Sequence, residues 1–278
     1  MYADPLASLY CSSLADWIRP YTEPYGFKAI PIHFHEILFS FAFYHLMFLS
    51  LPFITPLFVK SYKSMSLRTK VNTDIHIVSQ LQAVLILVLS WPLFTDEALN
   101  NDIIRGYTPY SGFVSAMACG YFIWDSYVCL RYINLFGPSF LLHGFSSLFV
   151  FVQTLRPYLL HYVPIFLLFE LSTPFVNNHW FFGHIPNNVP EIFKIINGIC
   201  LLVTFFSARI VWGFYQVYQI TFQIFTNQAL EGFPLWLPIT MLVANFALDC
   251  LNVIWFTKMI KLVHNKVTGG QKSEKKLN

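Results

Sequence analysis

The 278-residue chain is poor in charged residues: Asp, Glu, Lys and Arg make up 11% of it, whereas about 25% is usual in a soluble domain. Hydrophobic residues make up 56%, and 30 residues are Phe. One soluble core cannot enclose that much apolar surface, but a bilayer accepts it on the outside of a protein. The composition therefore excludes an ordinary soluble protein and indicates a multi-pass membrane protein.

The chain also lacks the common signatures of catalytic and metal sites. Its five cysteines show no CxxC spacing, which argues against a disulfide framework or a zinc finger. HExxH, GxSxG, P-loop and Rossmann glycine patterns do not occur, so hydrolase, ATPase and dehydrogenase functions lose support. We expect no cofactor and no metal. The formal charge of +3 fits membrane orientation better than nucleic-acid binding.

Long apolar stretches recur along the chain, separated by polar residues, Pro or Gly. Each is long enough for a helix to cross about 30 Å of hydrocarbon. They predict an all-α membrane protein of about seven transmembrane helices, near residues 34–58, 76–95, 111–134, 139–156, 157–177, 193–223 and 234–260. Residues 1–32 contain Asp4, Asp16 and Arg19, so we expect no cleavable signal peptide there and predict a short interfacial helix instead.

Lys and Arg are unequally divided between the two sets of alternate loops. One set holds twelve: Lys60, Lys63, Arg68, Lys70, Arg131, Lys194, Lys258, Lys261, Lys266, Lys272, Lys275 and Lys276. The other holds four: Arg19, Lys28, Arg105 and Arg156. Because basic flanks resist translocation, we expect a lumenal N-terminus and a cytosolic C-terminus.

The last four residues, Lys275-Lys276-Leu277-Asn278, resemble the dilysine retrieval signal of endoplasmic reticulum membrane proteins. The alternative is a solvated basic tail beside anionic lipid headgroups. Agreement with the loop count favours retrieval and predicts a location in the endoplasmic reticulum membrane.

Polar residues form stripes at helical spacing within five of the apolar stretches. A charge at membrane depth costs at least about 2.5 kcal/mol, so these residues should face the interior of the bundle. The stripes are His76, Ser79, Gln82 and Ser90; Tyr121, Asp125 and Tyr132; His143, Ser146, Ser147 and Thr154; Glu170, Thr173 and Asn177; and Asn245, Asp249 and Asn252.

The ionisable residues of these stripes allow a chemical or a structural role. A carboxylate at Asp125 could orient His143 as a general base for acyl transfer, or the two could form only an interhelical hydrogen bond. Arg209 and Glu170 suggest a structural ion pair. His33, His35, His179, His184 and His264 fall near predicted interfaces, where we expect them to be solvated.

Two blocks of sequence resemble the TLC-domain family. They are Gly120-Tyr121-Phe122-Ile123-Trp124-Asp125, followed by Leu141 to Ser147, and the stretch from Phe169 to Phe182, continued by Asn197-Gly198 and Phe205 to Ile210. The second block resembles the small TLC domain-containing membrane proteins more closely than the ceramide synthases, which have two adjacent histidines where this chain has His143-Gly144.

The resemblance covers about residues 70–262. It implies six helices forming a barrel around a lipid-accommodating cavity. The polar stripes then predict Gln82, Ser147, Glu170, Asn245 and Asp249 as its polar lining. The expected organisation is a lumenal or interfacial segment (1–32), a first transmembrane helix with a cytosolic basic loop (33–69), the TLC domain (70–262) and a cytosolic basic tail (263–278).

Three functions remain open at this stage. The first is a protein that binds or handles lipids or acyl chains and influences membrane lipid composition or trafficking. The second is a lipid acyltransferase with His143 as general base, Asp125 as its partner and acyl-coenzyme A as co-substrate. The third is an assembly or cargo factor for another membrane protein, and a homo-oligomer is also conceivable.

Overall fold

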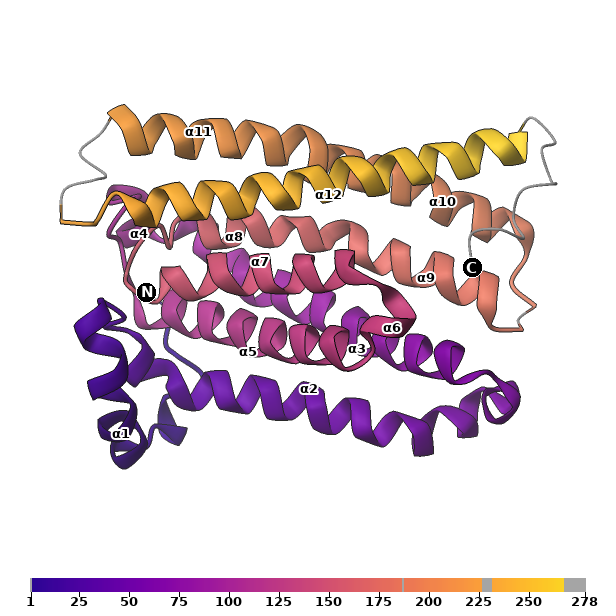
Figure 1. Ribbon diagram of the computed structural model, residues 1–278, viewed down its shortest axis with the longest axis horizontal. Helices are drawn as coiled ribbons and strands as arrows, with labels where there is room; N and C mark the ends of the chain where they lie inside the picture. Colours follow the sequence, from indigo (N-terminus) through magenta and orange to yellow (C-terminus); the bar gives the residue numbers. More distant parts are fainter. Residues whose placement is uncertain (1, 187, 227–231, 268–278) are drawn as a thin grey trace.

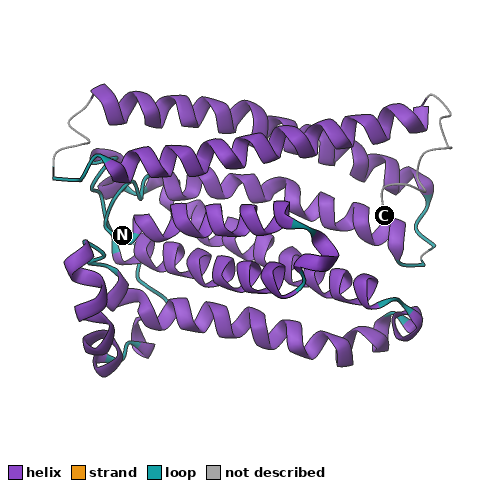
Figure 2. Ribbon diagram, in the orientation of Figure 1, coloured by secondary structure: helices purple, strands orange, loops and turns teal. Residues whose placement is uncertain are grey.

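The computed structural model describes residues 2–186, 188–226 and 232–267, and within these ranges it contains helices and loops and no strand (Figure 2). The fold prediction of an all-α membrane protein is confirmed. The α-helices are α1 (Ser12–Thr22), α2 (Ile30–Phe58), α3 (Leu67–Ser90), α4 (Glu97–Asn101), α5 (Pro109–Arg131), α6 (Ile133–Phe136), α7 (Pro138–Thr154), α8 (Tyr162–Leu167), α9 (Thr173–His184), α10 (Glu191–Phe205), α11 (Gly213–Thr226) and α12 (Trp236–Val267).

Short 3-10 or π segments join several of these helices into longer rods. A 3-10 turn extends α3 through Trp91–Thr95, and another, Leu168–Ser172, joins α8 to α9. The π segment Phe206–Trp212 joins α10 to α11 without a break. The sequence expectation of one long span near 193–223 therefore corresponds to a rod that changes its helical pitch in the middle.

Five helical rods are long and apolar enough to cross a membrane: Ile30–Phe58, Leu67–Thr95, Pro109–Arg131, Glu191–Thr226 and Trp236–Asn265. Between the third and fourth of these, α7 and the α8–α9 rod run through the same bundle in opposite directions (Figure 1). Helix α7 has 17 residues, a length of about 25 Å at 1.5 Å per residue. The chain crosses the bundle an odd number of times whether or not α7 and the α8–α9 rod are counted. The start of α2 and the end of α12 therefore lie at opposite ends of the bundle.

The rods after α2 form a closed ring. Each packs against its neighbours in the order α3, α5, α7, α12, the α10–α11 rod, the α8–α9 rod and again α3. Helix α2 lies outside this ring, packed on α5 and α3, and α1 packs on α2 (Figure 1). This arrangement leaves one interior, enclosed by six rods, in which polar side chains can meet away from lipid.

Helix α5 lies deepest, because it packs against α2 on one side and the ring on the other. Small residues recur on it every four positions at Gly112, Ala116 and Gly120, a spacing that lets helix backbones approach closely. A Cβ at Gly120 would lie 2.5 Å from the Ile37 carbonyl oxygen of α2. The Ser40 hydroxyl donates to the Met117 carbonyl across the same seam, at 2.7 Å.

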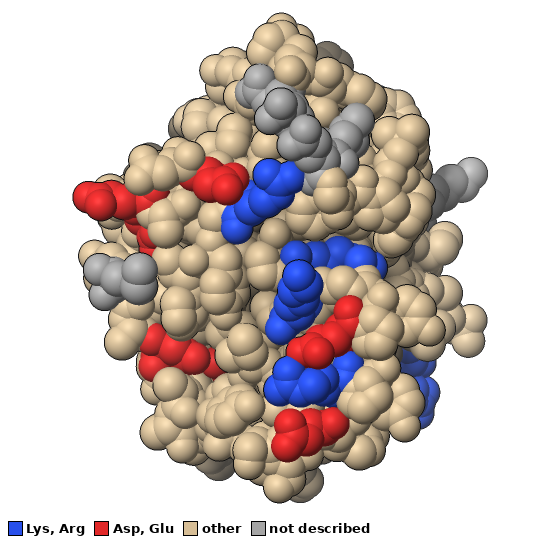
Figure 3. All heavy atoms as spheres, turned by 90° about the vertical axis from the view of Figure 1, so that its left-hand side faces the viewer, with Lys and Arg blue, Asp and Glu red and all other residues tan. Residues whose placement is uncertain are grey.

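The end of the bundle where α2 begins, here called the amino end, has well-defined caps. The Asp96 carboxylate accepts from the backbone of Ala98 and Leu99 at the start of α4, and from the Thr108 hydroxyl at 3.2 Å. Thr108 and Ser111 form a capping box at the start of α5, with Pro109 in the first turn. Acidic and basic side chains alternate over this end, among a mostly uncharged surface (Figure 3).

Candidate functional site

A small cavity lies inside the ring, with walls from α5, α7, the α8–α9 rod, the π segment and α12. Its volume is about 40 Å³, enough for a few water molecules. Six of the lining residues are polar: His143, Ser147, Glu170, Arg209, Asn245 and Asn252. Aromatic and aliphatic side chains, including Phe122, Phe151 and Phe169, complete the wall.

The Arg209 guanidinium is held by the neighbouring rod. Its Nε donates to the Phe169 carbonyl and to the Ser172 hydroxyl, each at 3.0 Å, and an Nη donates to the Thr173 hydroxyl at 3.1 Å. Arg209 belongs to the π segment, a helical irregularity that is frequent at functional sites because it re-aims side chains. The segment thus directs a positive charge at the interior of the ring.

The ion pair expected between Arg209 and Glu170 is not formed. Both residues line the cavity, but the guanidinium donates its hydrogen bonds to the backbone and hydroxyl groups at residues 169, 172 and 173. Glu170 is therefore a separate polar group on the cavity wall, close to the guanidinium. The two side chains form a polar patch in the cavity and not an internal ion pair.

His143 lies on the cavity wall, but Asp125 does not orient it. The His143 ring packs edge-on against Trp255, with 5.5 Å between ring centroids. The Asp125 carboxylate accepts a weak bond from the Cys129 thiol at 3.8 Å. It packs beneath Gly144, where an added Cβ would lie 2.8 Å from an Asp125 oxygen. No hydrogen bond joins Asp125 to His143 among the described residues, so the expected base and orienting acid are neighbours without forming a dyad.

The expected polar lining is partly assembled. Ser147, Glu170 and Asn245 line the cavity as expected, and Asn252 of the same α12 stripe joins them. Gln82 does not: it is buried between α3 and α2, where its side-chain oxygen accepts from the Tyr44 hydroxyl outside the ring. Asp249 is buried on α12 but is not among the lining residues; between Asn245 and Asn252 the cavity is lined by Leu248.

A second, apolar pocket continues the cavity towards the amino end. The two share Val150, Phe151, Phe166 and Asn245. Beyond these shared residues the wall is formed mainly by aliphatic and aromatic side chains, including Leu159, Ile220 and Met241. The interior of the ring is therefore polar near its middle and apolar nearer the amino end.

The stripe on α3 serves to close the ring. The His76 Nδ1 lies 2.7 Å from the Asn177 side-chain oxygen, and the Asn177 amide donates to Ser79 and Gln80. The His76 ring also stacks on Trp180, with centroids 4.7 Å apart. These contacts fasten α3 to α9, so part of the polar pattern within the membrane is structural.

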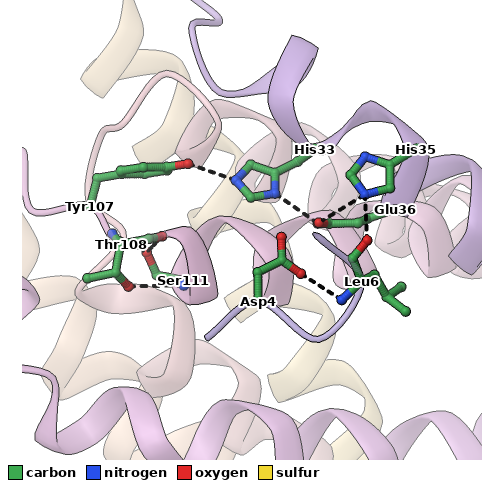
Figure 4. Close-up of polar contacts among 8 residues, drawn as sticks. All are labelled: Asp4, Leu6, His33, His35, Glu36, Tyr107, Thr108 and Ser111. Atoms are coloured by element: carbon green, nitrogen blue, oxygen red, sulfur yellow. Dashed lines mark hydrogen bonds and ion pairs between the residues drawn. The ribbon is translucent and has the colours of Figure 1, made fainter. Parts of the chain in front are cut away.

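One cluster outside the ring corrects the sequence expectation that His33 and His35 are solvated. His33 is 0% exposed and His35 is largely covered. His33 bonds to Glu36 and Tyr107 at the amino end (Figure 4). Burial raises the pKa of the Tyr107 hydroxyl to about 12, so this phenol stays protonated at neutral pH. Sequence spacing could not reveal the cluster, because Tyr107 is 74 residues from His33.

Comparison with known proteins identifies the family. The model of the TLC domain matches residues 72–261. An uncharacterised TLC domain-containing protein of Schizosaccharomyces pombe is 34% identical over 94% of this chain and 89% of its own length. Topoisomerase I damage affected protein 4 of Saccharomyces cerevisiae is 35% identical over 86% of this chain and 87% of its own.

A human relative, TLC domain-containing protein 4, is 28% identical over 72% of this chain and 77% of its own. None of these three carries the name of a ceramide synthase. This agrees with the resemblance to the small TLC domain-containing proteins that the sequence showed. The family match covers well over half of the chain, and the ring of helical rods is formed by described residues within or directly beside it: the protein belongs to the TLC-domain family.

Proposed function

We propose that this protein binds a membrane lipid or acyl chain inside the ring and thereby influences membrane lipid composition or trafficking. The observation that carries the proposal is the gathering of six polar side chains, Arg209, Glu170, Asn245 and Asn252 among them, in an interior that is apolar elsewhere. Polar groups at membrane depth are costly unless they serve a partner or a ligand. An amphiphile with a polar or anionic head fits this arrangement.

The two pockets suggest how such a molecule would lie. Its head would bond near Arg209 and Asn252, and its chain would follow the apolar wall towards Ile220 and Met241. Because the cavity of about 40 Å³ is much smaller than an acyl chain, the rods must separate on binding. The expected ligand is thus an amphiphile that widens the ring, entering between rods from the surrounding bilayer.

The proposal is tested by the lipids that copurify with the protein in mild detergent, measured by native mass spectrometry. Ser147→Leu fills the cavity and should reduce bound lipid at least several-fold. Cys250→Leu enlarges a side chain on the exposed face of α12 and should leave the amount of bound lipid unchanged. Equal lipid content in both variants, with both folded, would reject binding inside the ring.

A second candidate is an acyl-coenzyme A-dependent lipid acyltransferase, and the position of His143 on the cavity wall favours it. In such a reaction an acceptor amine or hydroxyl loses its proton to the imidazole and attacks the thioester carbonyl. The carbon–sulfur bond then breaks, and the proton passes to the departing thiolate. Since Asp125 does not bond to the ring, His143 would act without an orienting carboxylate.

Purified protein incubated with labelled acyl-coenzyme A and a panel of sphingoid, glycerophospholipid and amine acceptors decides between the two candidates. Product lost in folded His143→Gln but retained in His45→Gln, which alters a histidine of α2 outside the cavity, would establish the transferase. If lipid copurifies with the protein but no product forms, the lipid-binding proposal stands and the acyltransferase proposal is rejected.

We further propose that the protein resides in the endoplasmic reticulum with its amino end lumenal. Twelve Lys and Arg are assigned to the opposite side and four to the amino end, a bias that favours a cytosolic position for the basic side. The Lys275-Lys276 pair, which supports retrieval, lies outside the described residues.

A further inference from the structure

We propose that Asp4, His33 and Glu36 form a binding site for a divalent transition-metal ion of the zinc class at the amino end of the bundle. The inference is independent of the proposed lipid function, and it departs from the sequence expectation of no metal. It rests on three features of the cluster: its geometry, a buried carboxyl oxygen without a hydrogen-bond partner and the contacts that fix His33.

The three residues converge from separate parts of the chain (Figure 4). His33 and Glu36 lie one turn apart near the start of α2, and Asp4 comes from the segment before α1. One donor atom from each residue can be chosen so that all three lie within 4.8 Å of one another. Zinc–nitrogen and zinc–oxygen bonds are about 2.0–2.2 Å, so small side-chain movements would bring all three atoms onto one ion.

One acid of the cluster, Glu36, is buried without a full set of hydrogen-bond partners. Glu36 is 0% exposed, and its Oε1 has no hydrogen-bond partner. Within the described part of the chain, no Lys or Arg pairs with Asp4 or Glu36. His35 Nε2 lies 3.5 Å from Oε1, but it is bonded to the Leu6 carbonyl at 3.1 Å. A buried carboxylate in this setting requires a proton or a cation.

His33 is fixed in the orientation that a metal ligand needs. Its Nε2 lies 2.8 Å from the Tyr107 hydroxyl, and its Nδ1 lies 2.9 Å from Glu36 Oε2. When Nε2–H donates to Tyr107, Nδ1 presents a lone pair towards the carboxylates. This is the usual arrangement of a ligating histidine, whose other nitrogen donates to a second group. The ring also lies against Gly112, where a Cβ would be 2.2 Å from Nε2, so a side chain there would displace it.

The ligand set selects the class of ion. One imidazole nitrogen and two carboxylates suit zinc and its neighbours, whereas calcium and magnesium favour sets made only of oxygen. Asp4 is partly exposed, so a water molecule can complete the coordination. An ion here would fasten the segment before α1 to α2, and through Tyr107 to the loop that leads into α5.

The test begins with full-length protein in detergent, stripped with EDTA, to which ZnCl2 is returned. We expect about one zinc per chain by elemental analysis and a rise in Tm on adding zinc. Asp4→Asn should abolish both effects, and its partly exposed position favours folding. Asp16→Asn, an exposed acid of α1, is the matched control and should behave as wild type.

Tyr107→Phe supplies a graded readout, because it removes the group that bonds to His33 and leaves the three ligands in place. We expect zinc affinity to fall about 10–100-fold. Wild-type protein that binds no zinc and shows no zinc-dependent Tm would overturn the proposal and indicate a proton shared by the carboxylates. Zinc bound equally by wild type, Asp4→Asn and Glu36→Gln would overturn it too, since the ion would then occupy other surface groups.

Discussion

At the scale of single residues, Arg209 shows how an ionisable group is kept inside the ring. It is 7% exposed and makes three hydrogen bonds to the α8–α9 rod. The planar guanidinium offers donors in a fixed fork, which an ammonium group cannot reproduce. The same contacts hold the π segment against the neighbouring rod, so this residue links the charge of the cavity to the stability of its wall.

Arg209→Lys should therefore weaken the fold while keeping the charge. Losing one or two hydrogen bonds of a charged donor costs about 2–3 kcal/mol, which should lower Tm in detergent by several degrees. Arg131→Lys, at an exposed residue at the end of α5, should change stability by less than about 0.5 kcal/mol. Equal thermal shifts for the two variants would contradict this role of the guanidinium.

The sequence indicated which residue types would meet inside the ring, but not which atoms would bond. Helical spacing placed Ser147, Glu170 and Asn245 on inward faces, and the structure finds them at the cavity. It also suggested Arg209 with Glu170 and Asp125 with His143, and neither pair is bonded. A stripe fixes the face of a helix, whereas a hydrogen bond also depends on axial offset and rotamer, which packing sets.

At the scale of elements, α5 is organised by the small residues that face α2. Gly112 and Gly120 stand two turns apart, and each lies so close to α2 that a Cβ would approach its atoms to 2.5 Å or less. Ala116 between them is 0% exposed. Without a hydrophobic driving force between helices in lipid, such close packing is a main source of association.

Gly112→Ala and Gly198→Ala form a matched pair that tests this packing. Alanine gains about 1 kcal/mol of helix propensity over glycine, but at Gly112 its Cβ would lie 2.2 Å from the buried His33 ring, an overlap that costs about 1–3 kcal/mol. We expect the variant at Gly112 to have a lower Tm than wild type. At Gly198 of α10 no atom lies within 4 Å of an added Cβ, so the Tm of Gly198→Ala should equal or exceed that of wild type. A lower Tm for Gly198→Ala, with the Tm of Gly112→Ala unchanged, would refute the argument.

Element boundaries differ from the sequence expectation where polar residues continue a helix. The second span was expected from residue 76, but α3 begins at Leu67, because Ser66 caps it by accepting from the Thr69 backbone at 3.2 Å. Hydropathy locates apolar turns only, whereas the capped helix includes Arg68 and Lys70. The expected division at Arg156-Pro157 falls in the loop between α7 and α8, where proline ends the helical path.

At the scale of the whole molecule, the closed ring with α2 outside it leaves the two ends of the bundle facing opposite sides of a membrane. The loop between Asp96 and Thr108 belongs to the amino end (Figure 1). Asn101 and Asp102 are exposed there, whereas Leu99 is buried. An inserted sequence between Asn101 and Asp102 should therefore spare the packing of α4.

A glycosylation acceptor on a flexible insert at that point should be modified if the amino end is lumenal. A gel shift removed by endoglycosidase is the measurement, with the same insert after Ser64 on the basic side as the control that stays unmodified. If the control were modified and the insert after residue 101 were not, the amino end would be cytosolic and the proposed topology would be wrong.

The basic tail yields a separate prediction about location. Replacing Lys275 and Lys276 with serine should move a tagged protein from the endoplasmic reticulum to later secretory compartments, as seen by microscopy. Replacing Lys272 alone, three positions before Lys275 and outside the matching pattern, is the control. An unchanged reticular distribution of the double variant would show that retrieval does not depend on this pair.

Composition, apolar stretches and family blocks were enough to determine that this is an all-α membrane protein of the TLC-domain family with polar groups facing inward. These properties follow from burial preferences that each segment carries in itself. Only the tertiary structure placed Gln82 outside the ring, separated His143 from Asp125, and brought Asp4 and Tyr107 to His33. Contacts between distant segments depend on how the helices pack together, and no local pattern of residues records that packing.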